Sequence, residues 1–127
     1  MEWQDGALGL AGVIGVAVAT FHGVLVQRLM VRPFGAPSDI RMSEPIRRLI
    51  PPLLHFSTFN WFLGGLALIV VAAGVEPRAR LAVCLLVGSS YLFAAVANCR
   101  GTRGRHPGWM LMAVTLILIA VGAYRPY

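Results

Sequence analysis

The sequence predicts an all-α integral membrane protein, folded as an up-down-up-down four-helix bundle that forms a single transmembrane domain over residues 1–127. Apolar residues make up 57% of the chain and charged residues 13%, against roughly 25% charged in soluble domains. The apolar residues form four long runs, and nearly every charge lies between them. Each run has, or nearly has, the about 20 residues that a helix needs to cross a bilayer. The predicted spans cover about 8–30, 49–73, 81–97 and 109–123.

The first run is predicted to be a retained helix rather than a cleaved signal peptide. Glu2 and Asp5 precede it and arginines follow it, which is the reverse of a signal peptide's charge pattern. Pro33 is expected to end this helix. Gly15, Ala19 and Gly23 recur at every fourth position, so the helix presents a ridge of small residues that allows close packing.

The segment before the second run is expected to form a short interfacial helix over about 43–50. Ser43 is a typical N-cap residue, and Pro45 suits the first turn. Pro51 and Pro52 are expected to break or kink the helix before the second span. The third run follows a tight turn at Glu76-Pro77-Arg78. The loop Asn98–Trp109 then leads to the fourth run, because Pro107 is well placed to start a helix.

The distribution of arginine predicts the orientation. All eleven basic residues are arginines, and the net charge is +6. Eight of them lie in the first and third connections, against three on the other side, namely Arg78, Arg80 and Arg125. Because basic loops stay in the cytoplasm, both termini are predicted to lie outside the cytoplasm. The membrane itself is predicted to be a bacterial inner membrane. In a membrane chain this charge indicates orientation and contact with anionic lipid, not binding to nucleic acid.

Two histidines inside predicted spans are candidate functional residues. His22 lies eight residues before Met30, and His55 lies six residues after Leu49, so their depths differ by about 3 Å. Each imidazole is either neutral and hydrogen-bonded, with Ser57, Thr58 or Tyr91 as possible partners, or one of a pair that binds haem b or a transition metal. Haem propionates would then meet Arg47, Arg48 or Arg100. A third interpretation is a relay for protons or a polar substrate.

Other polar residues are candidates for a pocket or for anion binding. Asn60 in the second span indicates either a hydrogen bond between helices or a pocket wall. The polar pocket candidates are Ser57, Asn60, Tyr91 and Asn98. Arginine and glycine in the third connection either anchor the loop at the membrane or bind phosphate or carboxylate groups. The candidates for contact with an anionic lipid or substrate are Arg47, Arg48, Arg100, Arg103, Arg105 and His106.

Several short motifs resemble those of a group of small, uncharacterised bacterial four-span membrane proteins. They are Phe21-His22-Gly23, Arg32-Pro33, Leu54-His55-Phe56 and Gly104-Arg105-His106-Pro107-Gly108-Trp109. The last, GRHPGW, is the only tight motif of the four, and the resemblance extends over most of the chain. The resemblance implies a location in the bacterial inner membrane and implies no activity.

Three functions follow from these observations. The first is a non-enzymatic subunit or stabiliser of a membrane protein complex, which packs its small-residue surfaces against other membrane chains or a second copy of itself. The second is a redox protein that binds haem or a metal through His22 and His55. The third is a transporter or enzyme for a lipid-like or anionic substrate in a cytoplasm-facing cavity. No predicted span contains Asp or Glu, and the motifs GxSxG, HExxH and GxGxxG are absent, so the sequence leans away from an enzyme.

Overall fold

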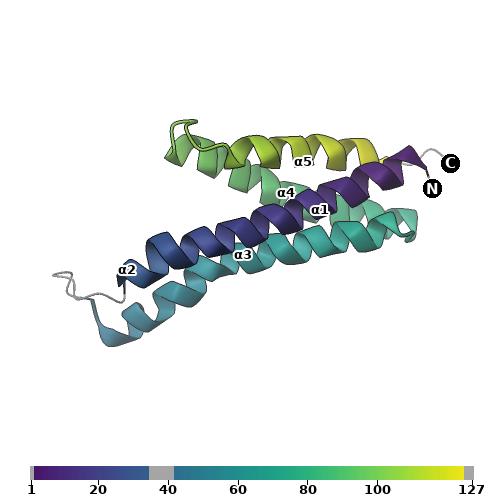
Figure 1. The fold of residues 1–127 in the computed structure, drawn as a ribbon. Helices are drawn as coiled ribbons and strands as arrows, with labels where there is room; N and C mark the ends of the chain where they lie inside the picture. Colours follow the sequence, from purple (N-terminus) through teal and green to yellow (C-terminus); the bar gives the residue numbers. More distant parts are fainter. Residues whose placement is uncertain (1, 35–41, 125–127) are drawn as a thin grey trace.

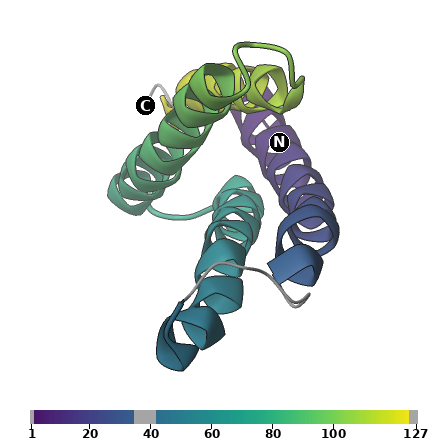
Figure 2. The same ribbon diagram turned by 90° about the vertical axis from the view of Figure 1, so that its left-hand side faces the viewer.

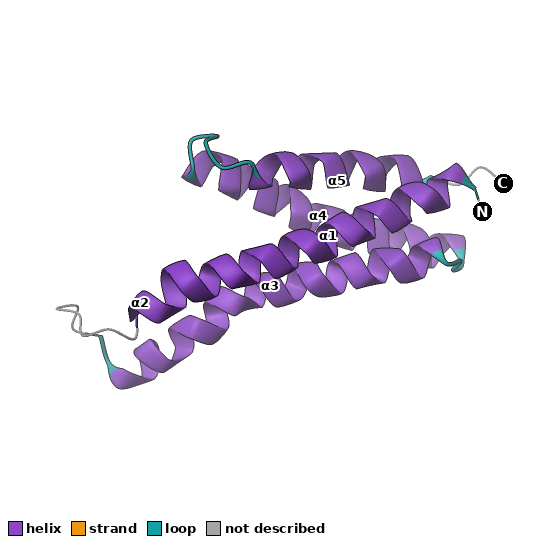
Figure 3. Ribbon diagram, in the orientation of Figure 1, coloured by secondary structure: helices purple, strands orange, loops and turns teal. Residues whose placement is uncertain are grey.

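The computed structural model describes residues 2–34 and 42–124, and all regular structure in these residues is helical (Figure 3). Helix α1 spans Trp3–Val26 and continues through a π-helical turn at Gln27–Val31 into α2, Arg32–Phe34. The three later helices are α3, Glu44–Ala72; α4, Pro77–Gly101; and α5, Gly108–Ala123. The all-helical fold predicted from the sequence is confirmed.

The helices form an elongated bundle with two distinct ends (Figure 1). The start of α1 and the end of α5 lie together at one end, here called the termini end. The α4–α5 loop and the start of α3 lie at the opposite end, here called the arginine end. Viewed from the arginine end, α1 lies beside α3, whereas α3 and α4 diverge from each other (Figure 2).

Three of the helices are long and apolar enough to cross a membrane: Trp3–Val31, Glu44–Ala72 and Pro77–Gly101. The fourth apolar helix, α5, has 16 residues and is therefore about 24 Å long at 1.5 Å per residue. Large apolar side chains such as Leu86 and Phe93 are exposed on the outside of the bundle. Such exposure suits a lipid environment and is unusual on a soluble protein.

Small residues on α1 allow it to pack closely against α3. Gly12, Gly15 and Ala19 are buried, as is Gly65 of α3. A Cβ atom on Gly12 would lie 2.6 Å from the carbonyl oxygen of Gly65, and one on Gly65 would lie 2.8 Å from the carbonyl oxygen of Gly12. The two backbones therefore touch where neither helix carries a side chain. Of the predicted ridge, Gly15 and Ala19 are buried. A Cβ atom on Gly15 would meet Tyr91 of α4, and one on Gly23 would lie 2.8 Å from Thr58 Cγ2 of α3, so these small residues pack inside this bundle.

The prolines do not interrupt the helices as expected. Pro33 lies within α2, so the prediction that it ends the first helix is wrong. The preceding π turn, in which the Arg32 N–H donates to the carbonyl of Gln27, widens the helix where an α-helical Pro33 would clash with the carbonyl four residues earlier.

Helix α3 likewise starts directly after Ser43, as predicted, and continues through Pro51 and Pro52. The expected break between an interfacial helix and the second span is therefore wrong. The two prolines leave the carbonyls of Arg47 and Arg48 without their usual helical partners. Both residues are exposed, so surrounding water or lipid headgroups can solvate those carbonyls.

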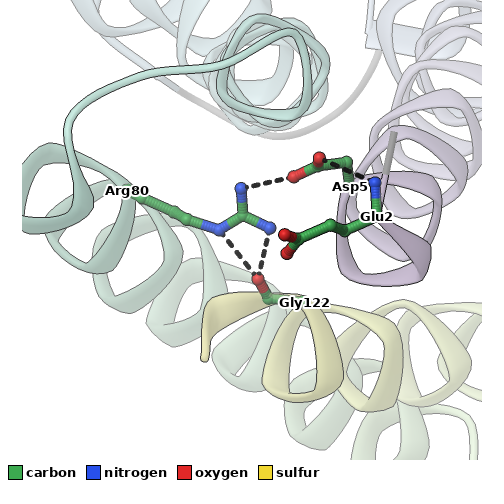
Figure 4. A network of polar contacts seen from close by, with 4 residues as sticks. All are labelled: Glu2, Asp5, Arg80 and Gly122. Carbon is green, nitrogen blue, oxygen red and sulfur yellow. Dashed lines mark hydrogen bonds and ion pairs between the residues drawn. The ribbon is translucent and has the colours of Figure 1, made fainter. Parts of the chain in front are cut away.

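A buried ion pair joins three helices at the termini end (Figure 4). Arg80 of α4 is 1% exposed and donates from Nη1 to Asp5 Oδ1 of α1 at 2.7 Å. Its Nε and Nη2 donate to the carbonyl oxygen of Gly122 in α5 at 2.9 and 2.7 Å. Asp5 also accepts the N–H of Glu2. One guanidinium thus links α1, α4 and α5, because its planar fork bonds a carboxylate and a helix-terminal carbonyl together.

Candidate functional site

A cavity of about 350 Å³ lies at the arginine end, between α1, α4 and α5 and beside the loop that joins α4 to α5. We call it the loop cavity. All but three of its lining residues are apolar, and the three polar ones are His22, Asn98 and His106. The full lining is Ala17, Val18, Phe21, His22, Leu25, Trp61, Ala94, Asn98, His106, Pro107, Gly108, Leu111 and Met112.

His22 is held by α3. Its Nε2 lies 3.2 Å from Ser57 Oγ, and its ring packs on Trp61 with the centroids 4.5 Å apart at 49°. The Ser57 hydroxyl donates its one proton to the carbonyl of Leu54 at 3.2 Å. His22 Nε2 is therefore the donor to Ser57, since a hydroxyl has a single proton to give. The prediction of a hydrogen-bonded His22 with Ser57 as partner is confirmed.

His55 has a different partner. Its Nε2 lies 3.0 Å from Oε1 of Gln27 in the π-helical turn. The Nε2 atoms of His22 and His55 are thus bonded to two different side chains, and neither points to a shared ligand. A bis-histidine haem or metal site would have to use the Nδ1 atoms or break both hydrogen bonds. Among the described residues, no group of three or more His, Cys, Asp or Glu side chains lies close enough to hold a metal ion.

His106 is the second histidine of the loop cavity. The N–H of Gly108 donates to His106 Nδ1 at 3.1 Å, so that nitrogen carries no proton and the ring proton is on Nε2. A Cβ atom on Gly108 would lie 2.9 Å from His106 Nδ1 and 3.6 Å from Asn98 Nδ2. The Nδ1–Cε1 edge of His106 and the Asn98 amide therefore both lie beside Gly108. The GRHPGW motif places an imidazole at the start of α5.

Asn98 contributes a side-chain amide to the wall of the loop cavity. It lies in α4, which continues to Gly101, beyond the predicted end of the third span. Its Oδ1 is buried without a hydrogen-bond partner, an arrangement that costs about 1–3 kcal/mol in most proteins. Its Nδ2 lies 3.6 Å from the position of a Cβ atom on Gly108 and makes no hydrogen bond within residues 2–34 and 42–124.

The five arginines predicted to contact an anion fall into two groups. Arg47 and Arg48 both pair with Glu44, at 2.7 and 2.9 Å, and all three side chains are exposed, so these pairs contribute little stability. Arg100, Arg103 and Arg105 are exposed around the α4–α5 loop and do not line the loop cavity. They contribute positive charge near the cavity mouth without filling it.

The main chain of the α4–α5 loop does not form an anion-binding nest. The N–H groups of Arg103, Gly104 and Arg105 donate to the carbonyls of Arg100, Cys99 and Thr102. His106 N–H donates to Thr102 Oγ1 at 3.4 Å. Trp109 Nε1 donates to Gly104 O at 3.2 Å and closes the loop. Any anion bound here would therefore contact side chains, not the loop backbone.

The other predicted pocket residues join α3 to α4. Asn60 Nδ2 donates to Ser90 Oγ at 2.8 Å, which confirms the predicted hydrogen bond between helices. Tyr91 is fully buried and donates to the carbonyl of Trp61 at 2.8 Å, so it does not contact His22 as one interpretation allowed. Two further cavities, of about 500 and 450 Å³, are both lined by Asn60 and Ser90. The first lies between α3 and α4, and the second also reaches His22 of α1 and brings together the predicted pocket residues Ser57, Asn60 and Asn98.

Sequence reasoning missed two features of these sites. Arg80 was placed just before the predicted third span, although it is 1% exposed and part of α4. Asp5 and Arg80 both lie toward the predicted outer ends of their spans, and this shared depth was the available signal. The position of His106 in the same cavity wall as His22 was also missed, because it depends on how the α4–α5 loop turns.

No protein-family model, curated protein or solved structure matches this chain. Its function therefore has to be inferred from the site itself.

Proposed function

We propose that this protein binds a lipid-like molecule in the loop cavity. The observation that carries the proposal is the cavity wall, which is apolar apart from His22, Asn98 and His106 at the arginine end. Phe21 of α1 and Leu111 of α5 line the cavity and are also exposed on the outside of the bundle. An apolar chain in the surrounding bilayer can therefore enter between these two helices, with its polar group at the arginine end.

The size of the cavity supports a single apolar chain as the occupant. Its volume of about 350 Å³ is near the lower end of the roughly 300–1,000 Å³ typical of small-molecule sites. A few well-placed polar groups in an otherwise apolar wall are also typical of such sites. Transport or chemistry on the bound molecule would be a later step, for which the described residues offer no metal cluster and no acidic side chain in the cavity wall.

Co-purified lipid tests this proposal. Ala17 lines the cavity and is exposed, so Ala17→Trp should fill the cavity without disturbing the core. Native mass spectrometry of wild-type protein should then show one tightly held lipid-like molecule that Ala17→Trp loses. Ala82→Trp is the matched control, since Ala82 is exposed on α4 and lines none of the three cavities. Equal lipid content in all three proteins would rule the proposal out.

We further propose that the chain crosses the inner membrane of a bacterium four times, up-down-up-down, with both termini outside. The support is the excess of arginine at the arginine end. Helix α5, about 24 Å long, crosses a ~30 Å hydrocarbon layer if the bilayer thins locally, at a modest cost. A cysteine at Arg103, with Cys84 and Cys99 replaced by serine, should react with a membrane-impermeant maleimide only after cells are permeabilised. Labelling in intact cells would reverse the orientation.

A role as a subunit of a membrane protein complex is the second candidate. The small-residue ridge that suggested it is buried within the chain, at Gly12, Gly15 and Ala19. A different observation favours it: the Asn60–Ser90 hydrogen bond is exposed, in the space where α3 and α4 diverge. Polar groups at membrane depth are usually covered by protein. A helix from another chain would cover this pair.

Cross-linking tests the subunit proposal at that position. A photoreactive residue replacing Leu63, which lines the same cavity as Asn60, should capture a defined membrane partner or a second copy in native membranes. The same residue at Leu81, exposed on α4 and outside the three cavities, should capture none. An identical pattern of adducts at both positions would count against a specific partner.

A further inference from the structure

The geometry points to a specific occupant of the loop cavity: we propose a single-chain amphiphile with an anionic, acceptor-only head group, held by His106 Nε2–H and Asn98 Nδ2. This inference rests on the proposed function and adds the chemistry of the ligand. Phosphate and carboxylate head groups share that chemistry. The chain of the amphiphile would lie along Phe21, Leu25 and Leu111, which line the rest of the cavity.

The hydrogen bonds of His106 and Asn98 identify the two free donors. His106 Nδ1 accepts the Gly108 N–H, so Nε2 carries the ring proton and makes no hydrogen bond in the described part of the chain. Asn98 Nδ2 lies 3.6 Å from the position of a Cβ atom on Gly108 and makes no hydrogen bond in the described part of the chain. The Nδ1–Cε1 edge of His106 lies beside the same position, so both side chains are close to Gly108. Two donors favour an acceptor-only head group over a hydroxyl, because a hydroxyl also carries a proton that needs an acceptor of its own.

The charges around the cavity favour an anion over a neutral acceptor. Arg100, Arg103 and Arg105 are exposed in the adjoining loop and in the last turn of α4. Helix α5 begins at Gly108 beside the cavity, so its positive dipole end lies near the head group. No acidic residue lines the cavity. The two donors and the nearby positive charges therefore both favour an anion at this end of the loop cavity.

His22 is assigned a different role from His106. Its Nε2 already donates to Ser57, and its ring packs on Trp61. It therefore forms part of the cavity wall, and its Nε2 proton is already bonded to Ser57. This difference between the two histidines makes the proposal testable with matched variants.

The experiment compares three probes in nanodiscs of neutral lipid: hexadecyl phosphate, hexadecanoate and hexadecanol, with affinities expressed per mole fraction in the bilayer. Both anionic probes should bind wild-type protein roughly ten- to hundredfold more tightly than hexadecanol, because hydrogen bonds to a charged group are the stronger ones. Asn98→Leu and His106→Phe should each reduce this preference to a few-fold, because the anionic probes lose charge-assisted hydrogen bonds and hexadecanol loses weaker neutral ones. His22→Phe should keep the preference.

Each contrary result has a distinct meaning. Equal binding of all three probes that Ala17→Trp abolishes would overturn the head-group inference and leave the proposed function standing. Binding no stronger than in Ala17→Trp for every probe would overturn both. Loss of the preference in His22→Phe but not in His106→Phe would overturn the assignment of the donors. Displacement of hexadecyl phosphate by millimolar inorganic phosphate would show that the chain is not needed, and would overturn the amphiphile.

Discussion

Replacing Arg80 with methionine is expected to lower the free energy of unfolding by about 3–5 kcal/mol, the usual cost of removing one partner of a buried ion pair. The guanidinium is 1% exposed and bonds Asp5 and Gly122 at once. Methionine fills similar volume, but it leaves the carboxylate without this cation and the helix-terminal carbonyl without two donors. Denaturant titration in detergent micelles, followed by circular dichroism, measures the loss.

A neighbouring arginine supplies the control. Arg78 lies two residues earlier on α4 and is exposed, so Arg78→Met should change stability by less than about 0.5 kcal/mol. Combining Arg80→Met with Asp5→Leu should recover part of the lost stability, because the double variant buries no uncompensated charge at this pair. If Arg80→Met and Arg78→Met are equally stable, the ion pair does not hold the three helices together.

Introducing a methyl group at Gly12 is expected to destabilise the bundle by about 1–3 kcal/mol, as overpacking usually does. The added Cβ would lie 2.6 Å from both the Gly65 carbonyl oxygen and Ile69 Cγ1, and 3.0 Å from Ile69 N. Two of these three atoms belong to the backbone of α3, so α1 and α3 have to separate. The same denaturant titration applied to Gly12→Ala measures the effect.

The matched control for Gly12 lies on the same helix. A Cβ on Gly6 meets nothing within 4 Å, so Gly6→Ala should be neutral or stabilising by up to about 1 kcal/mol, since alanine favours helix over glycine. Gly65→Ala should resemble Gly12→Ala, and the double variant should cost less than the sum, because the helices have already moved apart. Wild-type stability in Gly12→Ala would show that this contact is not tight.

Part of the candidate site could be predicted because it depends on local sequence. The similar depths of His22 and Ser57 follow from counting residues along two antiparallel helices, and their hydrogen bond is present. The role of His55 could not be predicted, because its partner Gln27 lies in a π-helical turn. A π-helical turn holds one extra residue, so it changes the direction of the side chains that follow it on the helix. No pattern in this sequence predicts such a turn.

The sequence by itself determined three things: that the helices are long and apolar enough for a lipid bilayer, that the fold is all helical, and where the main helices lie in the chain. These follow from the lengths of the apolar runs and the charges between them, since each backbone polar group in a bilayer must be satisfied within its own helix. Only the tertiary structure decided that Arg80 is buried, that Gly12 of α1 packs against Gly65 of α3, and that His106 and His22 line one cavity. Those outcomes depend on helix rotation and on the path of the α4–α5 loop. Both are set by contacts between residues far apart in the chain, which local pattern does not encode.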